Sequence, residues 1–492
     1  MASKQRSRLI KSIRAPSSVE VMSNTFWHLF RISVSFALLF ADNTILFTAI
    51  LLARLQATID RYNKKRQGIQ FYPKTVLITG IGTPHGLALA RAWSAEGHHV
   101  IGADVADLNL PIRSGGSMSN TLLTFYRIPK DHYISRIVDI VHREKVDVWI
   151  PCSPKATAIE DATAKEVIES RTSCKCVTFD TDLATRFLRA DSFIQYLAER
   201  NLPILERHQV HSRDSIHKIL HRSPSKSYQI RRLGSSANDS IAVVLPQRTL
   251  SKTYSDVSEI QISQDSPWIL QQRTRLGEFY ADILVVRGHV HAIKVRLAET
   301  RTPHWGASPL DEALATAIHR LMESFAVKGG MRMTGHLSVR LLVDEEFDQS
   351  SVRHAIHIAD CIPGAVAIEN LLRDATCPVT GYLSLLMPEP VDPAHWDVVA
   401  TLSPAKSRMS NLTVSECGFI VKLLSQVFPL SRIRRMKARI EEEAVPFLFW
   451  RDSRFSYQDP FPWWWHVHVY QPLREIWMAV KQIRELGLTN GS

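Results

Sequence analysis

A strand, a glycine-containing turn and a helix follow one another between Lys74 and Asp104, and no other feature of the sequence constrains the fold as strongly. The β-rich apolar run at 75–79 leads into the turn Gly80-Ile-Gly-Thr-Pro-His-Gly86, which is followed by apolar residues at helical spacing. A second apolar run ends at Asp104. Such a unit of about thirty residues places two parallel strands side by side with a helix packed on them. We therefore expect an α/β domain here.

The alternation of helices and strands continues to about residue 180. Helices are predicted within 139–144 and 156–170, and short buried strands at 146–150 and 176–179. This alternation is typical of a doubly wound parallel sheet. The glycines are spaced GxGxxxG rather than the GxGxxG of most dinucleotide sites, so the turn alone indicates NAD(P) only weakly. Asp104 at the second strand end is compatible with a ribose contact or with a turn cap.

An apolar segment precedes this domain, from Ile32 to Ala53. At about 1.5 Å rise per residue, it is long enough to cross a hydrocarbon core of about 30 Å. Asp42 and Asn43 lie at its middle, where a charged side chain costs about 2.5–3.5 kcal/mol, and basic residues flank it on both sides. The sequence is therefore compatible with a re-entrant hairpin turning at Asp42-Asn43, with a single tilted span or with a buried core helix.

We predict that residues 1–72 form a basic and apolar membrane anchor and that residues 26–55 contact the bilayer. Residues 381–492 are predicted to form a helical C-terminal region. Its Trp463-Trp-Trp465 cluster is a second candidate for membrane contact, because Trp prefers the lipid–water boundary. The predicted localisation is membrane-associated, with the catalytic part facing the cytoplasm.

Composition restricts the class of protein but not the partner. Hydrophobic residues make up 45% and charged residues 22%, as in ordinary globular proteins. Six cysteines without a CxxC pair indicate reduced thiols rather than a disulfide scaffold. The formal charge of +12 suits nucleic acid, anionic lipid and nucleotide phosphate equally. No nucleic-acid-binding module signature occurs, so no nucleic acid partner is expected. Two His-x-His pairs, at 289–291 and 466–468, lack the further ligands that zinc needs.

The segments after residue 180 occur in a characteristic order. A helix and an Asn-Leu-Pro turn ending at Pro203 come first. They are followed by strand-like runs at 228–231, 267–272, 281–286 and 335–344, and by a final run that ends at Pro363. Over about residues 74–375 this order resembles the ATP-grasp superfamily. It resembles more closely the fungal secondary-metabolite members that are similar to carbamoyl-phosphate synthase large-chain domains.

The resemblance implies α/β plus α+β architecture. A Rossmann-like pre-ATP-grasp domain is expected at 73–180, and two ATP-grasp lobes that close on ATP and Mg²⁺ at 181–380. Such enzymes activate a carboxylate as an acyl phosphate that an amine then attacks. The predicted function is therefore an ATP-dependent carboxylate–amine (amino acid) ligase of specialised metabolism, whose substrates are a small carboxylate and a small amine.

The resemblance also implies site residues. Arg231 takes the place of a phosphate-binding lysine and is the catalytic candidate, and Asp360 is the candidate metal ligand. Gln271, Gln272 and Glu278 are the candidates for nucleotide binding.

The sequence departs from the family where charge matters most. Arg340 stands where the family has its first metal-binding carboxylate, and a cation beside a Mg²⁺ site opposes metal binding. Ser192, after Asp191, replaces a second lysine. A catalytically weakened ATP-grasp fold that acts as a membrane-bound binding or scaffold partner is therefore the alternative, and an NAD(P)-binding oxidoreductase is the third hypothesis.

Overall fold

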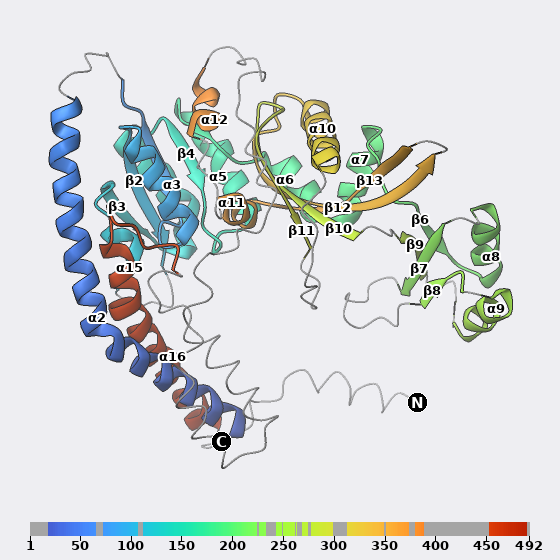
Figure 1. Ribbon diagram of the computed structural model, residues 1–492, viewed down its shortest axis with the longest axis horizontal. Coiled ribbons are helices and arrows are strands. Elements are labelled where there is room, and N and C mark those ends of the chain that lie inside the picture. Colours follow the sequence, from blue (N-terminus) through green and yellow to red (C-terminus); the bar gives the residue numbers. More distant parts are fainter. Residues whose placement is uncertain are drawn as a thin grey trace. The chain divides into compact units, whose positions relative to one another are not determined.

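The computed structural model describes residues 18–64, 72–106, 112–223, 226–232, 243–247, 249–260, 262, 268–273, 277–298, 312–348, 351–372, 379–387 and 452–489. The chain forms two compact units (Figure 1). The first comprises Met1–Thr157, Val167–Cys176 and Lys406–Ser492, and the second comprises Ala158–Glu166 and Val177–Ala405. The first unit thus contains both ends of the chain.

A five-stranded parallel sheet forms the centre of the first unit, in the order β3-β2-β1-β4-β5. Its central strand is fully apolar in its middle, where Leu77 and Ile78 are 0% exposed. The predicted α/β domain is confirmed, although the sequence analysis did not predict β3. The elements are β1 (Thr75–Thr79), α3 (Pro84–Ala95), β2 (His99–Val105), β3 (Leu122–Ile128), α4 (Tyr133–Glu144), β4 (Val148–Pro151), α5 (Ala158–Arg171) and β5 (Lys175–Cys176).

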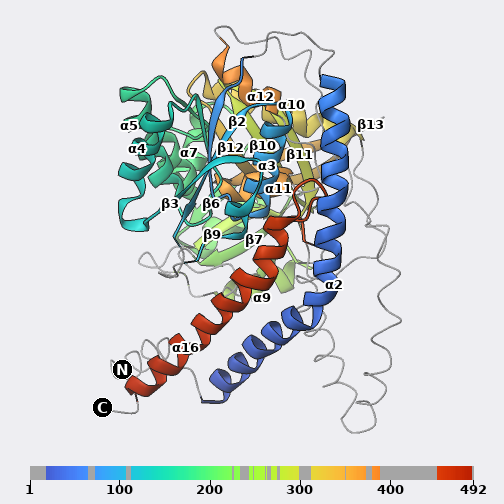
Figure 2. The same cartoon turned by 90° about the vertical axis from the view of Figure 1, so that its left-hand side faces the viewer.

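One long helix, α2 (Ser18–Lys64), precedes this sheet. It continues without interruption through Asp42 and Asn43, so the re-entrant hairpin is wrong. The C-terminal elements α15 (Phe461–Trp465), the π-helical η7 (His466–Tyr470) and α16 (Gln471–Thr489) confirm a helical C-terminal region within 452–489. Helices α2 and α16 lie side by side and run in opposite directions (Figure 2).

The loop before α15 is held to α3 and to the segment before β3 by the carboxylate of Asp459, which is 2% exposed. Arg91 Nε donates to its Oδ2 atom at 3.1 Å, and Ser119 Oγ donates to the same atom at 2.6 Å. The backbone N–H of Asn120 donates to Oδ1 at 3.1 Å. The C-terminal segment is therefore a structural part of the first unit.

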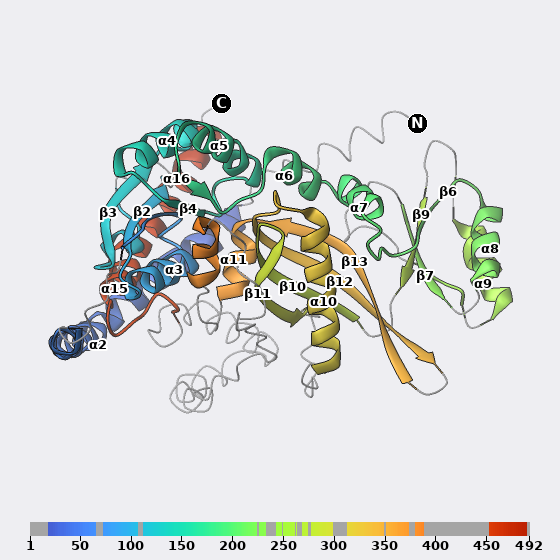
Figure 3. The same ribbon diagram turned by 90° about the horizontal axis from the view of Figure 1, so that it is seen from above.

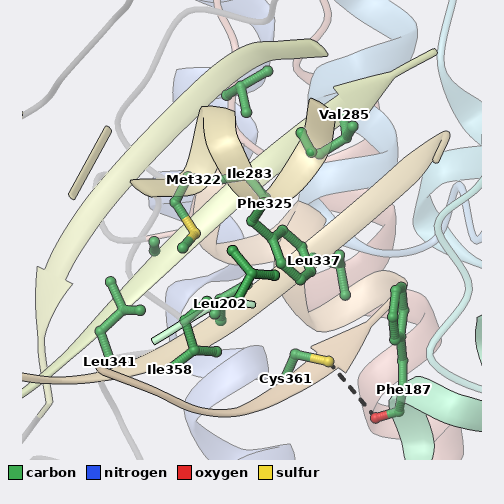
Figure 4. Close-up of a cluster of buried hydrophobic side chains, with 14 of the residues drawn as sticks. Phe187, Leu202, Ile283, Val285, Met322, Phe325, Leu337, Leu341, Ile358 and Cys361 are labelled. Atoms are coloured by element: carbon green, nitrogen blue, oxygen red, sulfur yellow. Dashed lines mark hydrogen bonds between the residues drawn. The ribbon is translucent and has the colours of Figure 1, made fainter. Parts of the chain in front are cut away.

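In the second unit, a four-stranded antiparallel sheet has the order β11-β10-β12-β13. One of its faces packs on helices through a core that includes Phe187, Phe325 and Leu337, all at most 2% exposed (Figure 4). Cys361 Sγ lies 3.7 Å from the Phe187 carbonyl oxygen. The elements are α6 (Thr181–Leu188), α7 (Ala190–Glu199), β10 (Gly277–Val286), β11 (His289–Leu297), α10 (Glu312–Gly329), β12 (Gly335–Asp348), β13 (Ser351–Pro363), α11 (Ala365–Leu372) and α12 (Val379–Leu383).

A second antiparallel sheet, β6-β9-β7-β8, belongs to the same unit. Helices α8 and α9 cover one of its faces, where Tyr228, Ile230 and Leu270 are 0% exposed (Figure 3). The expected α/β plus α+β fold class is thus confirmed: a parallel α/β sheet is followed along the chain by two helix-covered antiparallel sheets. The elements are β6 (Arg207–Val210), α8 (Arg213–Arg222), β7 (Ser227–Arg232), β8 (Val243–Leu245), α9 (Leu250–Glu259) and β9 (Trp268–Arg273).

Candidate functional site

The β6-β9-β7-β8 sheet is unusually basic. Its four described strands contain four arginines and no Asp or Glu. The arginines are Arg207 on β6, Arg231 and Arg232 on β7, and Arg273 on β9. Since guanidinium groups bind phosphate and carboxylate oxygens, this sheet is suited to an anionic ligand.

Strand register sorts these arginines between the two faces. Tyr228 and Ile230 belong to the helix-covered face, so alternation along β7 assigns Arg231 to the opposite face. Gln271 pairs with Arg207 and with Gln229, which brings Arg207, Gln271 and Arg231 onto that same face. Arg273, two residues after Gln271, shares it. We call the face defined by Arg207, Arg231, Gln271 and Arg273 the basic face; the three arginine side chains themselves lie outside the described part.

Gln272, the other predicted nucleotide contact on this strand, belongs to the helix-covered face. It pairs with Tyr228 and is 8% exposed, and its backbone N–H donates to the Glu206 carbonyl oxygen at 2.9 Å. Of the predicted site residues on this sheet, Arg231 and Gln271 therefore share a face and Gln272 does not.

An ion pair at the start of β7 was not predicted from the sequence. Lys226 donates to Glu206, and the Tyr228 hydroxyl donates to Glu206 Oε2 at 2.9 Å. The hydrogen bond from Lys226 holds the pKa of the Glu206 carboxyl below its usual value, against the effect of burial. A lysine directly before the strand β7 was the sequence signal that could have identified this cation.

The β11-β10-β12-β13 sheet also has one polar face. Alternation along β10 directs Phe279, Ala281 and Ile283 to the core, so that the residues between them belong to the other face. Cross-strand pairing places further charged residues beside them. We call this the paired face; it carries Glu278, Tyr280, Asp282, Lys294, Arg296, Arg340 and Asp360.

Arg340 connects two of the predicted site residues. Its Nη2 and Nε atoms lie 2.7 and 2.9 Å from Asp360 Oδ2, and its Nη1 lies 3.4 Å from Glu278 Oε2. Burial lowers the pKa of Arg340, but Asp360 and Glu278 outweigh this effect and leave the pKa above its ordinary value. Glu278 and Asp360 are thus brought together, and a guanidinium group joins them.

A second ion pair lies deeper in the paired face. Arg296 Nε donates to Asp282 Oδ2 at 2.8 Å, and the Asp282 side chain is 0% exposed. Burial raises the pKa of the Asp282 carboxyl, although Arg296 opposes this. The Arg296 guanidinium lies 4.2 Å from the centre of the Tyr280 ring, within the range of a cation–π contact.

These contacts do not fit the magnesium ion that the sequence led us to expect at Asp360. Mg²⁺ needs carboxylate oxygens that are free to coordinate it, and both candidate carboxylates accept hydrogen bonds from Arg340. Throughout the described ranges, no group of three or more His, Cys, Asp or Glu side chains could hold a metal ion.

The glycine turn of the first unit is filled by protein. A Cβ atom at Gly82 would lie 2.4 Å from Asp104 Oδ2, which places a negative charge against the turn. The Thr83 hydroxyl accepts from the Gly86 N–H at 3.1 Å and caps α3, and Arg454 Nε lies 3.4 Å from the Gly82 carbonyl oxygen. Packing of protein against protein accounts for these glycines without a dinucleotide.

Among the residues that the structure describes, one helix, from Phe26 to Leu55, is long and apolar enough to cross a membrane. Its mean hydropathy is 2.0, and only 17% of its most apolar window is buried. The tryptophan cluster, in contrast, faces protein. Trp463 is 0% exposed, and Trp465 Nε1 donates to the Arg113 carbonyl oxygen at 3.2 Å.

No protein-family model and no curated protein matches the chain. Several solved structures are similar. The biotin carboxylase subunit of pyruvate carboxylase matches with a TM-score of 0.46 at 10% identity, over 65% of this chain and 71% of that chain. An L-amino acid ligase from Bacillus licheniformis matches with a TM-score of 0.34 at 14% identity, over 60% and 68%. Phosphoribosylglycinamide synthetase from Anaerococcus prevotii gives 0.38 at 13% identity, over 60% and 68%.

Proposed function

We propose that this protein is an ATP-dependent carboxylate–amine ligase of the ATP-grasp type and that the basic face binds the phosphates of ATP. The observation that carries the proposal is the gathering of Arg207, Arg231 and Arg273 on one face of a sheet whose described strands contain no carboxylate. Guanidinium groups can each donate two hydrogen bonds to a phosphate. Phosphoryl transfer depends chiefly on positioning and charge neutralisation, which fixed cations supply.

The chain passes directly from the basic face to the paired face. Strand β9 ends at Arg273 in one sheet, and β10 begins at Gly277 in the other. Gln271 and Glu278 therefore lie on either side of one short connection. This continuity supports a nucleotide site built from both sheets, in which a small carboxylate is phosphorylated and then attacked by an amine. An amino acid or a related acid of specialised metabolism is the proposed substrate class.

A second candidate function is a catalytically weakened ATP-grasp fold that serves as a binding or scaffold partner. The ion pairs of Arg340 with Asp360 and Glu278 favour it, because they occupy the carboxylates that a catalytic Mg²⁺ would use. This candidate retains anion binding by the basic face and lacks turnover.

Two measurements on the full-length protein separate the candidates. Thermal shift with ATP, in millimolar Mg²⁺ and in EDTA, tests binding. Release of ADP or AMP with panels of amino acids and amines tests catalysis. Amine-dependent release supports the ligase, and binding without release supports the scaffold. Failure to bind ATP in either buffer rejects both. Protection by NADPH and not by ATP would favour an oxidoreductase.

We also propose that α2 anchors the protein to a membrane through residues 26–55, with the nucleotide site in the cytoplasm. The length, the mean hydropathy of 2.0 and the exposure of the helix support the anchor. The four described cysteines are buried, and the sequence contains no CxxC pair, as suits a reducing compartment. Cell fractionation tests the location, and recovery in the soluble fraction would contradict it.

A further inference from the structure

Several polar side chains of α2 are directed toward the C-terminal segment. Asp42 Oδ2 lies 2.9 Å from His468 Nε2, and the Asp42 and His468 side chains are 5% and 3% exposed. Trp464 Nε1 donates to Asn43 Oδ1 at 2.9 Å, and Ser35 Oγ donates to the Val467 carbonyl oxygen at 2.9 Å. We call this line of contacts the polar seam.

The polar seam continues from His468 into the first turns of α16. The carboxylate of Glu475, whose side chain is 10% exposed, contacts both His28 and Arg31, the latter at 3.2 Å. The two ends of the chain are therefore joined by ion pairs at Asp42 and at Glu475. This arrangement is favourable only where the partners stay together, because separation would leave buried charges unpaired.

Most of the exposed side chains in the middle of α2 are apolar. Phe36, Phe40 and Phe47 on α2 are 67%, 86% and 71% exposed. Ile476 and Trp477 on α16 are 46% and 37% exposed, beside the exposed cations Arg474 and Lys481. A helix in water buries its apolar face and exposes its polar one. On α2 the arrangement is reversed, as it is for helices that lipid surrounds, and α16 adds apolar side chains to the exposed surface.

The exposed hydroxyl groups of α2 are satisfied without water. Ser33, Thr44 and Thr48 each donate to the carbonyl oxygen four residues earlier in the helix, at 2.9, 3.1 and 2.7 Å. Such bonds are an option in water, but a hydroxyl group in hydrocarbon requires a partner within the protein.

We infer that α2 and α16 enter a lipid bilayer together, with the polar seam between them and their apolar outer faces against hydrocarbon. The inference deepens the proposed anchoring by α2, on which it rests, and adds α16 and the seam. Charge indicates an anionic membrane, because Arg54, Arg61, Lys64, Lys65 and Arg66 follow the apolar stretch. The contact with His468 offsets part of the cost that a lone Asp42 would impose in hydrocarbon.

Flotation with vesicles of phosphatidylcholine and phosphatidylserine tests the role of α16. The variant Ile476→Ser/Trp477→Ser is compared with Leu123→Ser/Leu250→Ser, which alters two other exposed side chains, 66% and 69% exposed, on β3 and α9. We expect the α16 variant to bind vesicles at least about tenfold more weakly, because it loses two apolar side chains that hydrocarbon would bury, and the control to bind like wild type.

The outcomes are distinct. If the wild-type protein and the α16 variant float equally well, this inference is overturned and anchoring by α2 stays intact. Wild-type protein that does not float overturns the anchoring as well, and a stable dimer would then assign the apolar faces to a second copy. ATP binding, measured on the same samples, reports on the ligase proposal independently.

A charge exchange tests the polar seam. Asp42→His and His468→Asp should each weaken vesicle binding and lower the thermal midpoint of the vesicle-bound protein, because each leaves two like groups face to face. The double exchange should restore much of the loss, since it recreates the pair in reverse. Single variants that behave like wild type, or a double variant no better than the singles, would show that the seam does not hold the helices together.

Discussion

The two antiparallel sheets of the second unit differ in the arrangement of their charged residues. The β6-β9-β7-β8 sheet contains four arginines within its described strands and no carboxylate there to balance them. On the β11-β10-β12-β13 sheet, Arg340 contacts Asp360 and Glu278, and Arg296 contacts Asp282. Cations on a sheet whose described strands contain no carboxylate favour an external anion, whereas paired charges stabilise the protein itself. The presence of charged residues on a face does not by itself make that face a binding face.

The largest effect should follow from breaking the deepest pair. Arg296→Met leaves Asp282, which is 0% exposed, without its cation, and we expect a loss of about 3 kcal/mol of unfolding free energy. Urea denaturation of the second unit measures it. The double variant Asp282→Leu/Arg296→Met should recover most of the loss, because it buries no unpaired charge. A single variant as stable as wild type would mean that the paired face is not structural.

A smaller effect, on binding rather than on stability, distinguishes the basic face. Arg231→Ala should weaken ATP binding about tenfold, or about 1.4 kcal/mol. Arg232→Ala is the matched control, because the next residue of β7 belongs to the opposite face. Titration calorimetry measures both affinities. Equal losses would remove the distinction between the two faces of this sheet.

Converting the paired face should create a metal site. Arg340→Met frees Glu278 and Asp360, whose side chains are 48% and 38% exposed, so the stability loss should stay below about 1 kcal/mol. The variant should gain a Mg²⁺-dependent thermal shift that wild type lacks. If wild type already shows that shift, the guanidinium group does not exclude the metal.

At neutral pH the smallest effect is that of His291, because it appears only as the pH falls. Burial, helped by neighbouring His289 and opposed by Glu323, lowers the pKa of His291 on β11 to about 4. The unfolded chain takes up this proton near its ordinary pKa of about 6.5, so stability should fall as the pH drops from about 6.5 to about 4. His291→Gln should flatten the profile of thermal midpoint against pH over that window. An unchanged profile would exclude His291 as the source.

The sequence contained the local information on the fold but not its long-range pairing. Short β-rich apolar runs predicted β1 and β2, and apolar residues at helical spacing after the glycine turn predicted α3. Strand β3 was missed because it is an edge strand with a mostly half-buried pattern and the mixed sequence Leu-Leu-Thr-Phe-Tyr-Arg-Ile. Burial on only part of a face weakens the hydrophobic pattern from which strands are predicted.

The candidate site was predictable as a set of residues and not as a set of contacts. The sequence indicated that Arg340 replaces a carboxylate. Its pairing with Asp360 depends on a register that shifts at a bulge between Arg340 and Leu341. The separation of Gln271 from Gln272 follows from alternation once Tyr228 is known to be buried. The charge of Asp42 argued against a simple membrane span. Its partner His468 lies 426 positions away and could not be found from the sequence.

That separation has a consequence for how the protein is made. The ribosome adds Asp42 to the chain 426 positions before it adds His468. At about 5–20 residues per second, Asp42 waits roughly 20 to 90 s for its partner. Until then the apolar helix α2 contains the Asp42 carboxylate at its centre without its His468 partner. Only a chain translated past His468 can supply this contact, so α2 and the segment around His468 come together after both sheets of the second unit have been synthesised.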